Sequence, residues 1–420
     1  MITKDNGLRY AKLIHVSVDN GKTGNSNKVY IMEELTDGRI RCDYGRVGKE
    51  LTIEYKDKSK WDTVYKQKLS KAKNYTDVTE LMVEPVVSKT GAKTVDITDK
   101  EVKKLIDDLM AFANKSIQQN YKVTQEAVSE QQVNAAQEVI DSINKILNIG
   151  VDTKTLNDLL MKLYTTIPRK MKDVRDHLFS DVTNKASLKE AKDLINNEQD
   201  TLDTMAGQVK LLKQKANLGN TKGDITILEQ MGVSIELETD PKQLELIHKL
   251  LGPNKSQVKR IFKVNNPKTA ATFDKRYSSA TIKKKRLYWH DSRNENWFNL
   301  LQTGLLIRPA GAVHTGSMFG DGIYFADKAQ KALGYSSLKN SYWTKGNSDK
   351  GYLALFDVHV GNQKEILHHN SSCYSLCEKI LQKDKYDSVF AKGGADLRNN
   401  EYVIYNIQQC TISHLMELGA

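Results

Sequence analysis

Hydrophobic and polar residues alternate along two stretches near the start of the chain, residues 10–18 and 27–35. Residues 19–26 between them are rich in Asn, Gly and Ser, the residue types that favour hairpin turns. A third such segment, residues 39–48, is followed by a lysine-rich stretch that can form a helix. This pattern predicts a small β-rich domain over residues 1–90.

A helical period replaces the alternation over residues 97–217. Apolar residues recur three and four positions apart after three capping-box signals, which begin at Thr98, Ser129 and Ser187. Gly150 and Pro168 stand where two of these helices should end. We therefore expect an all-α domain of consecutive helices.

The remaining stretch, residues 218–420, has a mixed pattern. Strand-like segments are separated by short helices and glycine-rich turns, at 258–264, 286–290, 322–326, 352–360 and 401–408. They do not alternate with long helices, which disfavours a doubly wound parallel sheet. No G-x-G-x-x-G motif follows a strand, so a dinucleotide site of the Rossmann type is not expected. The fold class predicted for the whole chain is α+β with several domains.

Composition narrows the class of protein. The 420 residues are 39% hydrophobic and 27% charged, which is typical of a globular chain with buried cores. No apolar run approaches the roughly 20 residues that span a bilayer, and the first residues contain no apolar signal segment, so no membrane partner is expected. Four cysteines exclude a disulfide scaffold and favour a reducing compartment. That compartment would be the nucleus of a eukaryote, or the cytoplasm or nucleoid for a prokaryotic or viral protein.

A net charge of +11 favours polyanionic partners, and two clusters carry much of it. Residues 39–73 contain eleven Lys or Arg against five Asp or Glu. Residues 255–286 contain eleven against one and end in the KKKR run 283–286. That run could follow a polyanion, serve as a nuclear-localisation-like signal or simply solubilise the surface, and we favour the last.

Four residues in the mixed stretch could carry chemistry. His290 ends a predicted strand, Tyr324 follows a glycine-rich turn, Tyr335 lies eleven residues further on, and Glu401 begins an apolar strand. Taken singly, each is more often a packing or surface residue.

Together, however, the segments around them closely resemble the catalytic domain of poly(ADP-ribose) polymerases. The similarity runs through GLLIRP, TGSMFGDGIYFAD and NNEYVIYN in the family's order. The segments 128–147 and 156–171 resemble the family's helical regulatory domain. DGRIRCDYGRVG resembles its WGR domain, with Tyr44 at the usual tryptophan. The resemblance implies a WGR-like DNA-binding domain (1–90), a helical regulatory domain (97–217) and a mixed α/β ADP-ribosyltransferase domain (218–420).

The resemblance also implies roles for individual residues. His290, Tyr324 and Glu401 match the family's catalytic triad: the histidine would hold a ribose hydroxyl of NAD+, and the glutamate would contact the nicotinamide ribose and the acceptor hydroxyl. Tyr324 and Tyr335 would flank the nicotinamide ring. The remaining residues expected at the NAD+ site are Asp291, Ser292, Arg308, Gly322 and Lys331.

Three positions depart from the family pattern. Asp291 stands where a glycine is usual, Ala332 where a serine is usual, and Leu306 where an arginine is usual, with Arg308 two residues on. The first two favour one alternative, a catalytically weak scaffold that binds DNA ends.

The implied activity is a DNA-break-stimulated transferase that consumes NAD+, releases nicotinamide and makes poly(ADP-ribose) on protein acceptors, itself included. No metal is expected: His368, His369, Cys373 and Cys377 fit no zinc spacing. The helical domain would restrain access to NAD+ until DNA is bound. A mono-ADP-ribosyltransferase of the same fold is a further alternative.

DNA strand breaks would bind the first domain. The candidate contacts are Arg46, Lys56, Lys58, Lys60 and Trp61. The alternative for the lysines is a solvated helix face, and for Trp61 a place in the core.

Overall fold

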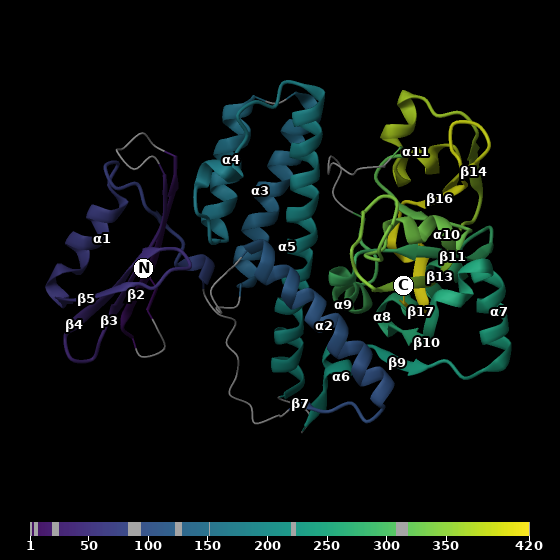
Figure 1. Ribbon diagram of the computed structural model, residues 1–420, viewed down its shortest axis with the longest axis horizontal. Coiled ribbons are helices and arrows are strands. Elements are labelled where there is room, and N and C mark those ends of the chain that lie inside the picture. Colours follow the sequence, from purple (N-terminus) through teal and green to yellow (C-terminus); the bar gives the residue numbers. More distant parts are fainter. Residues whose placement is uncertain are drawn as a thin grey trace. The chain divides into compact units, whose positions relative to one another are not determined.

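The computed structural model describes residues 2–3, 7–18, 25–82, 94–121, 128–150, 152–219, 224–307 and 318–419. The chain divides into two compact units (Figure 1). Unit 1 comprises residues 1–87 and 116–209, and unit 2 comprises residues 88–115 and 210–420. Within the described residues, no helix combines the length and apolarity needed to cross a membrane.

Unit 1 begins with an antiparallel sheet in the order β1-β2-β3-β4-β5, and β6 pairs with β2 on the same edge as β1. The strands are β1 (Ile2–Thr3), β2 (Arg9–Ser17), β3 (Ser26–Glu34), β4 (Arg39–Arg46), β5 (Thr52–Asp57) and β6 (Thr76–Asp77). Helix α1 (Trp61–Leu69) follows β5. The strands predicted from the alternating pattern are confirmed. Leu13 and Met32 belong to a core cluster with Trp61, while Ile14 and Val29 belong to a second cluster on the opposite face of the sheet.

The helices of the middle stretch are α2 (Lys100–Tyr121), α3 (Glu130–Ile149), α4 (Thr153–Thr166) and α5 (Lys185–Gly219). The capping box at Ser129 is confirmed, and α4 ends two residues before Pro168. The other two predicted boxes are wrong. The carboxylate of Asp99 caps α2 by accepting from the backbone of Glu101 and Val102, and the side chain of Asn184 caps α5. Both caps use Asn or Asp side chains, which are at least as good at this position as Ser or Thr.

Three contacts inside unit 1 join its sheet to its helices. The Asn27 amide donates to the carbonyl of Arg169 at 2.8 Å, and Arg46 donates to the carbonyls of Met171 and Lys172. Arg169 in turn forms a buried bidentate ion pair with Glu198 of α5, at 2.6 and 2.9 Å. The β-rich and helical parts of unit 1 therefore share one connected set of contacts.

Among its described residues, unit 2 contains two larger sheets and one pair of short parallel strands, Thr94–Val95 with Ile225–Thr226. The first has the order β11-β13-β17-β10-β9 and is antiparallel throughout. The second has the order β12-β16-β15-β14, with one parallel pair, β14 and β15. A doubly wound parallel sheet is absent from this described part of the chain, as the sequence pattern predicts.

The strands of unit 2 are β7 (Thr94–Val95), β8 (Ile225–Thr226), β9 (Ser234–Leu237), β10 (Val258–Asn265), β11 (Lys285–Asp291), β12 (Ile323–Phe325), β13 (Lys350–His359), β14 (Gln363–Ile366), β15 (Ser388–Ala391), β16 (Glu401–Ile404) and β17 (Cys410–Gly419). Its helices include α6 (Ile227–Met231), α7 (Pro241–Leu251), α8 (Pro267–Ser279), α9 (Asn294–Thr303), α10 (Ala329–Ala332) and α11 (Glu378–Lys383).

Residues 100–115 of α2, which are most of the helix, belong to unit 2, and the rest belongs to unit 1. Apolar side chains of the longer part, including Val102, Leu105 and Leu109, are buried in the same core cluster as Phe262 and Tyr352. The stretch predicted as one all-α domain is therefore divided between the two units.

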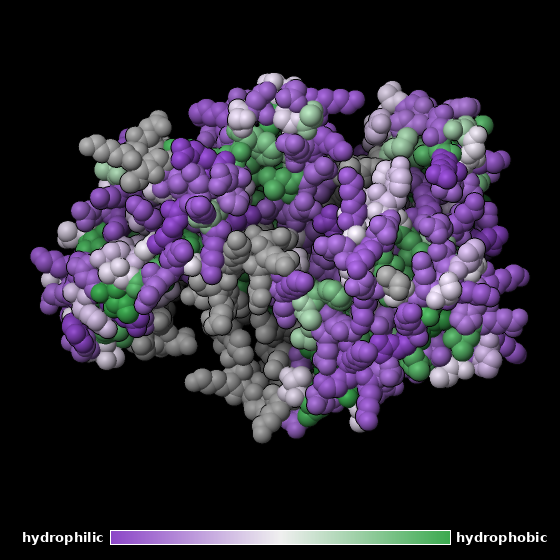
Figure 2. Space-filling view, viewed as in Figure 1, coloured by the Kyte–Doolittle hydropathy of each residue, from purple (hydrophilic) through white to green (hydrophobic). Residues whose placement is uncertain are grey.

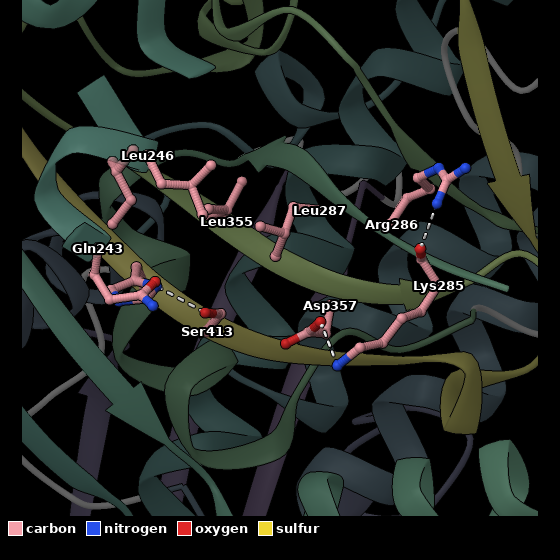
Figure 3. A pocket seen from close by; sticks show the side chains of 10 residues that line it. Gln243, Leu246, Lys285, Arg286, Leu287, Leu355, Asp357 and Ser413 are labelled. Atoms are coloured by element: carbon pink, nitrogen blue, oxygen red, sulfur yellow. Dashed lines mark hydrogen bonds and ion pairs between the residues drawn. The ribbon is translucent and has the colours of Figure 1, made fainter. Parts of the chain in front are cut away.

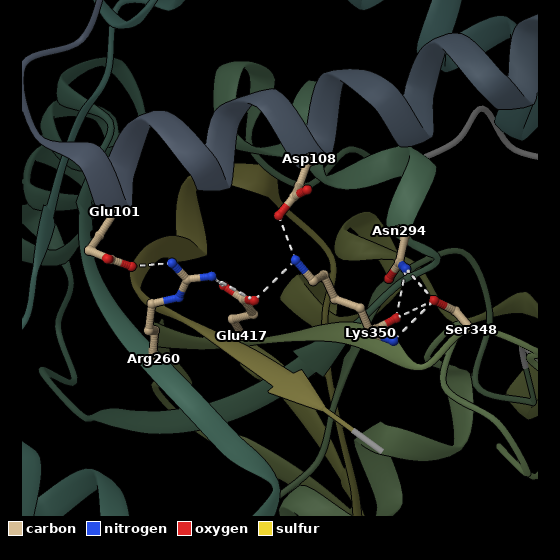
Figure 4. Close-up of polar contacts among 7 residues, drawn as sticks. All are labelled: Glu101, Asp108, Arg260, Asn294, Ser348, Lys350 and Glu417. Atoms are coloured by element: carbon tan, nitrogen blue, oxygen red, sulfur yellow. Dashed lines mark hydrogen bonds and ion pairs between the residues drawn. The ribbon is translucent and has the colours of Figure 1, made fainter.

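Charged side chains also join α2 to the first sheet of unit 2 (Figure 4). Arg260 lies between Glu101 of α2 and Glu417 of β17, and Lys350 lies between Glu417 and Asp108 of α2. The chain of alternating charges crosses from the helix to the sheet and back. It fixes the direction of α2 on the sheet, because each cation is held by two carboxylates.

Hydrophilic side chains predominate on the face drawn in Figure 2. The large apolar side chains are mostly inside: Trp61, Trp289 and Trp297 are each at most 1% exposed. Trp343 differs, with 61% of its surface exposed.

Candidate active site

The end of β11 lies against the end of β12, so that residues far apart in the sequence meet. Trp289 and Ala326 exchange two backbone hydrogen bonds, at 2.8 and 2.9 Å. One residue further along β11, the ring of His290 reaches the backbone carbonyl of Tyr324 at 3.0 Å. The strand-end histidine and the tyrosine after the glycine-rich turn, both predicted as site residues, are therefore direct neighbours.

His290 is held as a neutral imidazole in one tautomer. A carbonyl oxygen only accepts, so the Nδ1 of His290 carries the proton and donates it to Tyr324. Burial lowers the pKa of His290 below its ordinary range, so the ring is uncharged at neutral pH. The rings of Phe325 and Phe356 pack edge-on against it. Nε2 is left as a hydrogen-bond acceptor.

Tyr324 is fixed through its hydroxyl, which makes two hydrogen bonds. Its hydroxyl donates to the carbonyl of Gly320 at 2.8 Å and accepts from the backbone of Phe319 at 2.9 Å. Just before it, a Cβ at Gly322 would lie 2.4 Å from Cγ1 of Val403. Gly322 therefore lets β12 approach β16 closely, which brings Tyr324 to the strand that carries Glu401.

Glu401 is the first residue of β16 and forms an ion pair with Lys331 of α10. Nζ of Lys331 lies 2.8 Å from Oε1 of Glu401, and each side chain is only 13% exposed. Lys331 also donates to the carbonyl of Asn400 at 2.7 Å. Burial lowers the pKa of Lys331, and the charge of Glu401 opposes that shift. The second oxygen, Oε2, is buried and has no hydrogen-bond partner among the described residues.

Tyr335 completes the group of predicted side chains. It ends the short helix η5 (Leu333–Tyr335) directly after α10. Burial, together with the nearby charge of Glu401, raises the pKa of Tyr335 to about 12. Its hydroxyl is therefore neutral at physiological pH. The structure thus brings His290, Tyr324, Lys331, Tyr335 and Glu401 together.

Asp291 and Ser292 directly follow His290, and the Asp291 side chain points to the opposite face of β11. Successive side chains of a strand point to opposite faces, and Asp291 pairs with Leu353 in the core on the face opposite to His290. Its carboxyl accepts from the backbone of Ser292 at 2.7 Å, and burial raises its pKa well above the ordinary range. The carboxyl at this glycine position therefore lies away from the face of His290.

Two side-chain contacts of Asn400, the residue before Glu401, escaped the sequence analysis. The Asn400 amide donates to Asp327 at 2.7 Å and its side-chain oxygen accepts from the backbone of Gly393 at 2.9 Å. These bonds fix the residue before Glu401. The sequence feature that could have indicated these bonds is an asparagine directly before Glu401, the first residue of β16. Arg308, by contrast, lies outside the described residues.

The predicted DNA contacts in unit 1 differ in exposure. Lys58 and Lys60 are exposed, and Lys56 pairs with Glu54 at 2.5 Å. Trp61 is completely buried in the core of the sheet, with the Arg9 guanidinium 4.8 Å above its ring. The core-packing alternative therefore holds for Trp61, which is not placed to touch DNA. The guanidinium of Arg46 donates hydrogen bonds to the carbonyls of Met171 and Lys172, in the helical part of unit 1.

The His and Cys residues at 368–377 do not converge on a metal. His369 bonds to the carbonyl of Met318 at 2.7 Å, and His368 lies 3.5 Å from Asp396. Within the ranges that the structure describes, no three His, Cys, Asp or Glu side chains are grouped as metal ligands.

A pocket of about 330 Å³ lies elsewhere in unit 2, between α7, β11, β13 and β17 (Figure 3). Leu287 of β11 lines it, from the face of the strand opposite to His290. Lys285, from the basic run 283–286, pairs there with Asp357 at 3.2 Å. The pocket contains none of the residues predicted for NAD+.

Comparison with known proteins gives consistent matches. The model of the poly(ADP-ribose) polymerase catalytic domain matches residues 242–420. Protein 100L of Invertebrate iridescent virus 6, described as poly [ADP-ribose] polymerase-like, is 32% identical over 162 residues, which are 38% of this chain and 84% of that protein. Human poly [ADP-ribose] polymerase 2 is 32% identical over 160 residues, 31% of this chain and 26% of that protein.

One relative extends the similarity beyond that domain. The poly [ADP-ribose] polymerase of Drosophila melanogaster is 25% identical over 369 residues, which cover 77% of this chain. The same alignment covers 34% of the Drosophila protein, so this chain spans about a third of that relative.

Proposed function

Because the chain belongs to the poly(ADP-ribose) polymerase family and is therefore an NAD+ ADP-ribosyltransferase, we propose that it makes poly(ADP-ribose) on protein acceptors, itself included, when it engages broken DNA. The observation that carries the polymer-forming part is the buried, unpartnered Oε2 of Glu401 beside Lys331. The DNA-dependent part rests on the similarity of unit 1 to the family's N-terminal domains.

His290 would hold a ribose hydroxyl of NAD+. Its Nδ1 proton is committed to the Tyr324 carbonyl, so Nε2 can accept a hydrogen bond from a ribose hydroxyl. A protonated ring could not do so. The low pKa that burial gives His290 therefore keeps it in the useful form.

Tyr324 and Tyr335 would flank the nicotinamide ring. The ring is cationic in NAD+, and aromatic faces attract planar cations. Ser292 and the backbone of Asp291 would meet its carboxamide, which is possible because the Asp291 side chain lies on the other face of β11. Gly322 would act through the close approach of β12 and β16 rather than by direct contact.

Glu401 would act where charge develops. When the bond between nicotinamide and ribose breaks, nicotinamide leaves with the bonding electron pair and the ribose becomes an oxocarbenium-like cation. A fixed carboxylate about 4 Å away, at an effective dielectric constant of about 20, stabilises that cation by about 4 kcal/mol. If the gain is confined to the transition state, it amounts to roughly a thousandfold in rate.

The acceptor hydroxyl would approach the opposite face of the same ribose. Its oxygen forms the new bond to the anomeric carbon, and its proton passes to the carboxylate of Glu401. Lys331 holds Oε1, which leaves Oε2 to receive that hydroxyl. When the acceptor is a ribose hydroxyl of an earlier ADP-ribose unit, the same step lengthens a chain.

In unit 1, exposed lysines would neutralise DNA phosphates. Lys58 and Lys60 lie just before α1 and are both exposed. The alignment with the Drosophila enzyme over 77% of this chain supports the WGR-like and helical assignments. The helical part would then limit access to NAD+ until DNA is bound.

One experiment tests the proposal as a whole. The full chain is incubated with labelled NAD+, with and without nicked duplex DNA, and the products are separated by length. We expect a ladder of long products that requires the DNA. A single added unit would indicate a mono-ADP-ribosyltransferase, and nicked-DNA binding without label or nicotinamide release would indicate a scaffold.

A further inference from the structure

Trp343 is a surface tryptophan whose position is defined by the backbone around Tyr335. Its backbone N–H donates to the carbonyl of Gly334 at 2.8 Å, and the backbone N–H of the next residue, Thr344, donates to the same carbonyl at 3.4 Å. A Cβ at Gly334 would lie 2.9 Å from Cδ1 of the indole. Only a residue without a side chain at 334 lets the indole come this close.

The indole lies along the ring of Tyr335. The two ring centroids are 6.1 Å apart and the planes differ by 22°, an offset stacked arrangement. Tyr335 itself is 38% exposed, so the surrounding chain does not enclose it completely. The packed indole therefore limits which way the tyrosine can turn.

The loop that carries Trp343, residues 336–349, is cross-braced internally. Lys339 and Ser348 are joined by a 2.9 Å backbone bond, and Ser348 donates to the carbonyl of Ser337 at 2.9 Å. The hydroxyl of Ser341 accepts from the backbone of Gly346 at 2.7 Å. These hydrogen bonds join the two halves of the loop and fix their positions relative to each other.

The loop is also tied to the other wall of the site. The backbone of Asn294 donates to the Ser337 hydroxyl at 2.9 Å. The Asn294 amide donates to the Ser348 hydroxyl at 3.4 Å and to the carbonyl of Lys350, the first residue of β13, at 2.8 Å (Figure 4). Asn294 is two residues after Ser292, at the start of α9. The loop therefore connects Tyr335 with the strand end that bears His290 and Ser292.

We propose that residues 336–349 form a brace for the nicotinamide pocket, and that Trp343 is the positioning residue that sets the ring of Tyr335. The inference rests on the proposed role of Tyr335 in flanking nicotinamide. Trp343 acts through Tyr335 and needs no contact with the substrate. The brace lowers the ordering cost of binding, because Tyr335 is already held before NAD+ arrives.

Three full-length variants test the brace. W343A removes the indole, W343F keeps an aromatic face, and Y55A removes a half-exposed tyrosine of unit 1 whose ring packs on Arg39 instead. We expect W343A to raise the KM for NAD+ and the Kd for nicotinamide about fivefold, the size of one lost aromatic contact, with a much smaller change in kcat. W343F should restore both values and Y55A should leave them unchanged.

Tryptophan fluorescence gives an independent readout. It is recorded on the wild-type chain, so it does not require that a variant folds. Trp343 is the exposed one of the four tryptophans, so its emission is red-shifted and open to quenchers, while the other three are buried. Nicotinamide binding to the wild-type chain should change the red-shifted emission, and the W343F chain should show no such change.

Equal nicotinamide affinity in wild type and W343A, measured by calorimetry, would overturn the brace while leaving the nicotinamide site intact. If the wild-type chain binds no nicotinamide, the proposed roles of Tyr324 and Tyr335 fail and the brace fails with them.

Discussion

Lys331 and Glu401 form a nearly buried ion pair in which only one carboxylate oxygen is engaged. Nζ of Lys331 lies 2.8 Å from Oε1 of Glu401, while Oε2 is buried without a partner in the described part of the chain. A buried polar atom without a partner is costly, and such atoms often mark functional sites. The pair thus orients the carboxylate and leaves one oxygen for a substrate.

Replacing Lys331 should therefore impair transfer. K331M removes the partner of a carboxylate that is only 13% exposed, and we expect at least a roughly tenfold fall in kcat. K331R keeps the charge and should retain more activity. The measurement is nicotinamide release at saturating NAD+. Equal rates in K331M and wild type would show that the pair does not orient Glu401.

The burial of His290 predicts the acid limb of the pH profile. Burial lowers the pKa of the ring, so the active neutral form persists below the ordinary histidine value of about 6.5. As pH falls through the lowered pKa, Nε2 takes up a proton and can no longer accept from the ribose. We expect kcat/KM to decline only below about pH 6.5. A histidine-dependent decline that begins above this value would contradict the assigned state of His290.

Asp291 predicts a pH dependence of stability. Burial raises its pKa, so the folded chain keeps a proton that the unfolded chain releases above about pH 4. The free energy of unfolding must then fall as pH rises between the unfolded and folded pKa values. D291N keeps an acceptor for the Ser292 backbone but has no proton to lose.

We expect D291N to gain stability over wild type as pH rises from about 4 towards 8, measured by denaturant unfolding. Parallel stability curves for the two chains across this range would show that the Asp291 carboxyl titrates alike in both states.

The Arg169–Glu198 pair allows a test of whether the helical part of unit 1 restrains access to NAD+. Both side chains are under 10% exposed, so E198Q, which breaks the charge pair, should destabilise unit 1 by about 3 kcal/mol. If the helical part limits access to NAD+, the loosened variant should release more nicotinamide without DNA than wild type does.

D158N is the matched control, since its partner Lys154 is 85% exposed and the pair should contribute at most about 1 kcal/mol. A destabilised E198Q chain whose activity still depends fully on DNA would reject restraint by these helices.

Much of the fold follows from local patterns, and the exceptions have physical causes. Alternation predicted β2 and β3, and the Ser129 capping box predicted the start of α3. The division of α2 between two units could not be predicted, because the apolar spacing of Val102 and Leu105 shows that a face is buried but not which core covers it.

The candidate site was predictable only in part. His290, Tyr324 and Glu401 are far apart in the sequence, and their meeting depends on the β11–β12 bridge and the β12–β16 pairing, so only resemblance to a family could join them. The pairing of Lys331 with Glu401 and the stacking of Trp343 on Tyr335 depend on side-chain directions that spacing does not give.

The most direct test of the chemistry compares wild type with E401Q, in the presence of nicked DNA, for both nicotinamide affinity and product length. Gln keeps the size of the side chain but has no negative charge and no strong base. We expect E401Q to bind nicotinamide as wild type does and to lose chain elongation almost entirely. Wild-type chain lengths from E401Q would contradict the role assigned to this carboxylate.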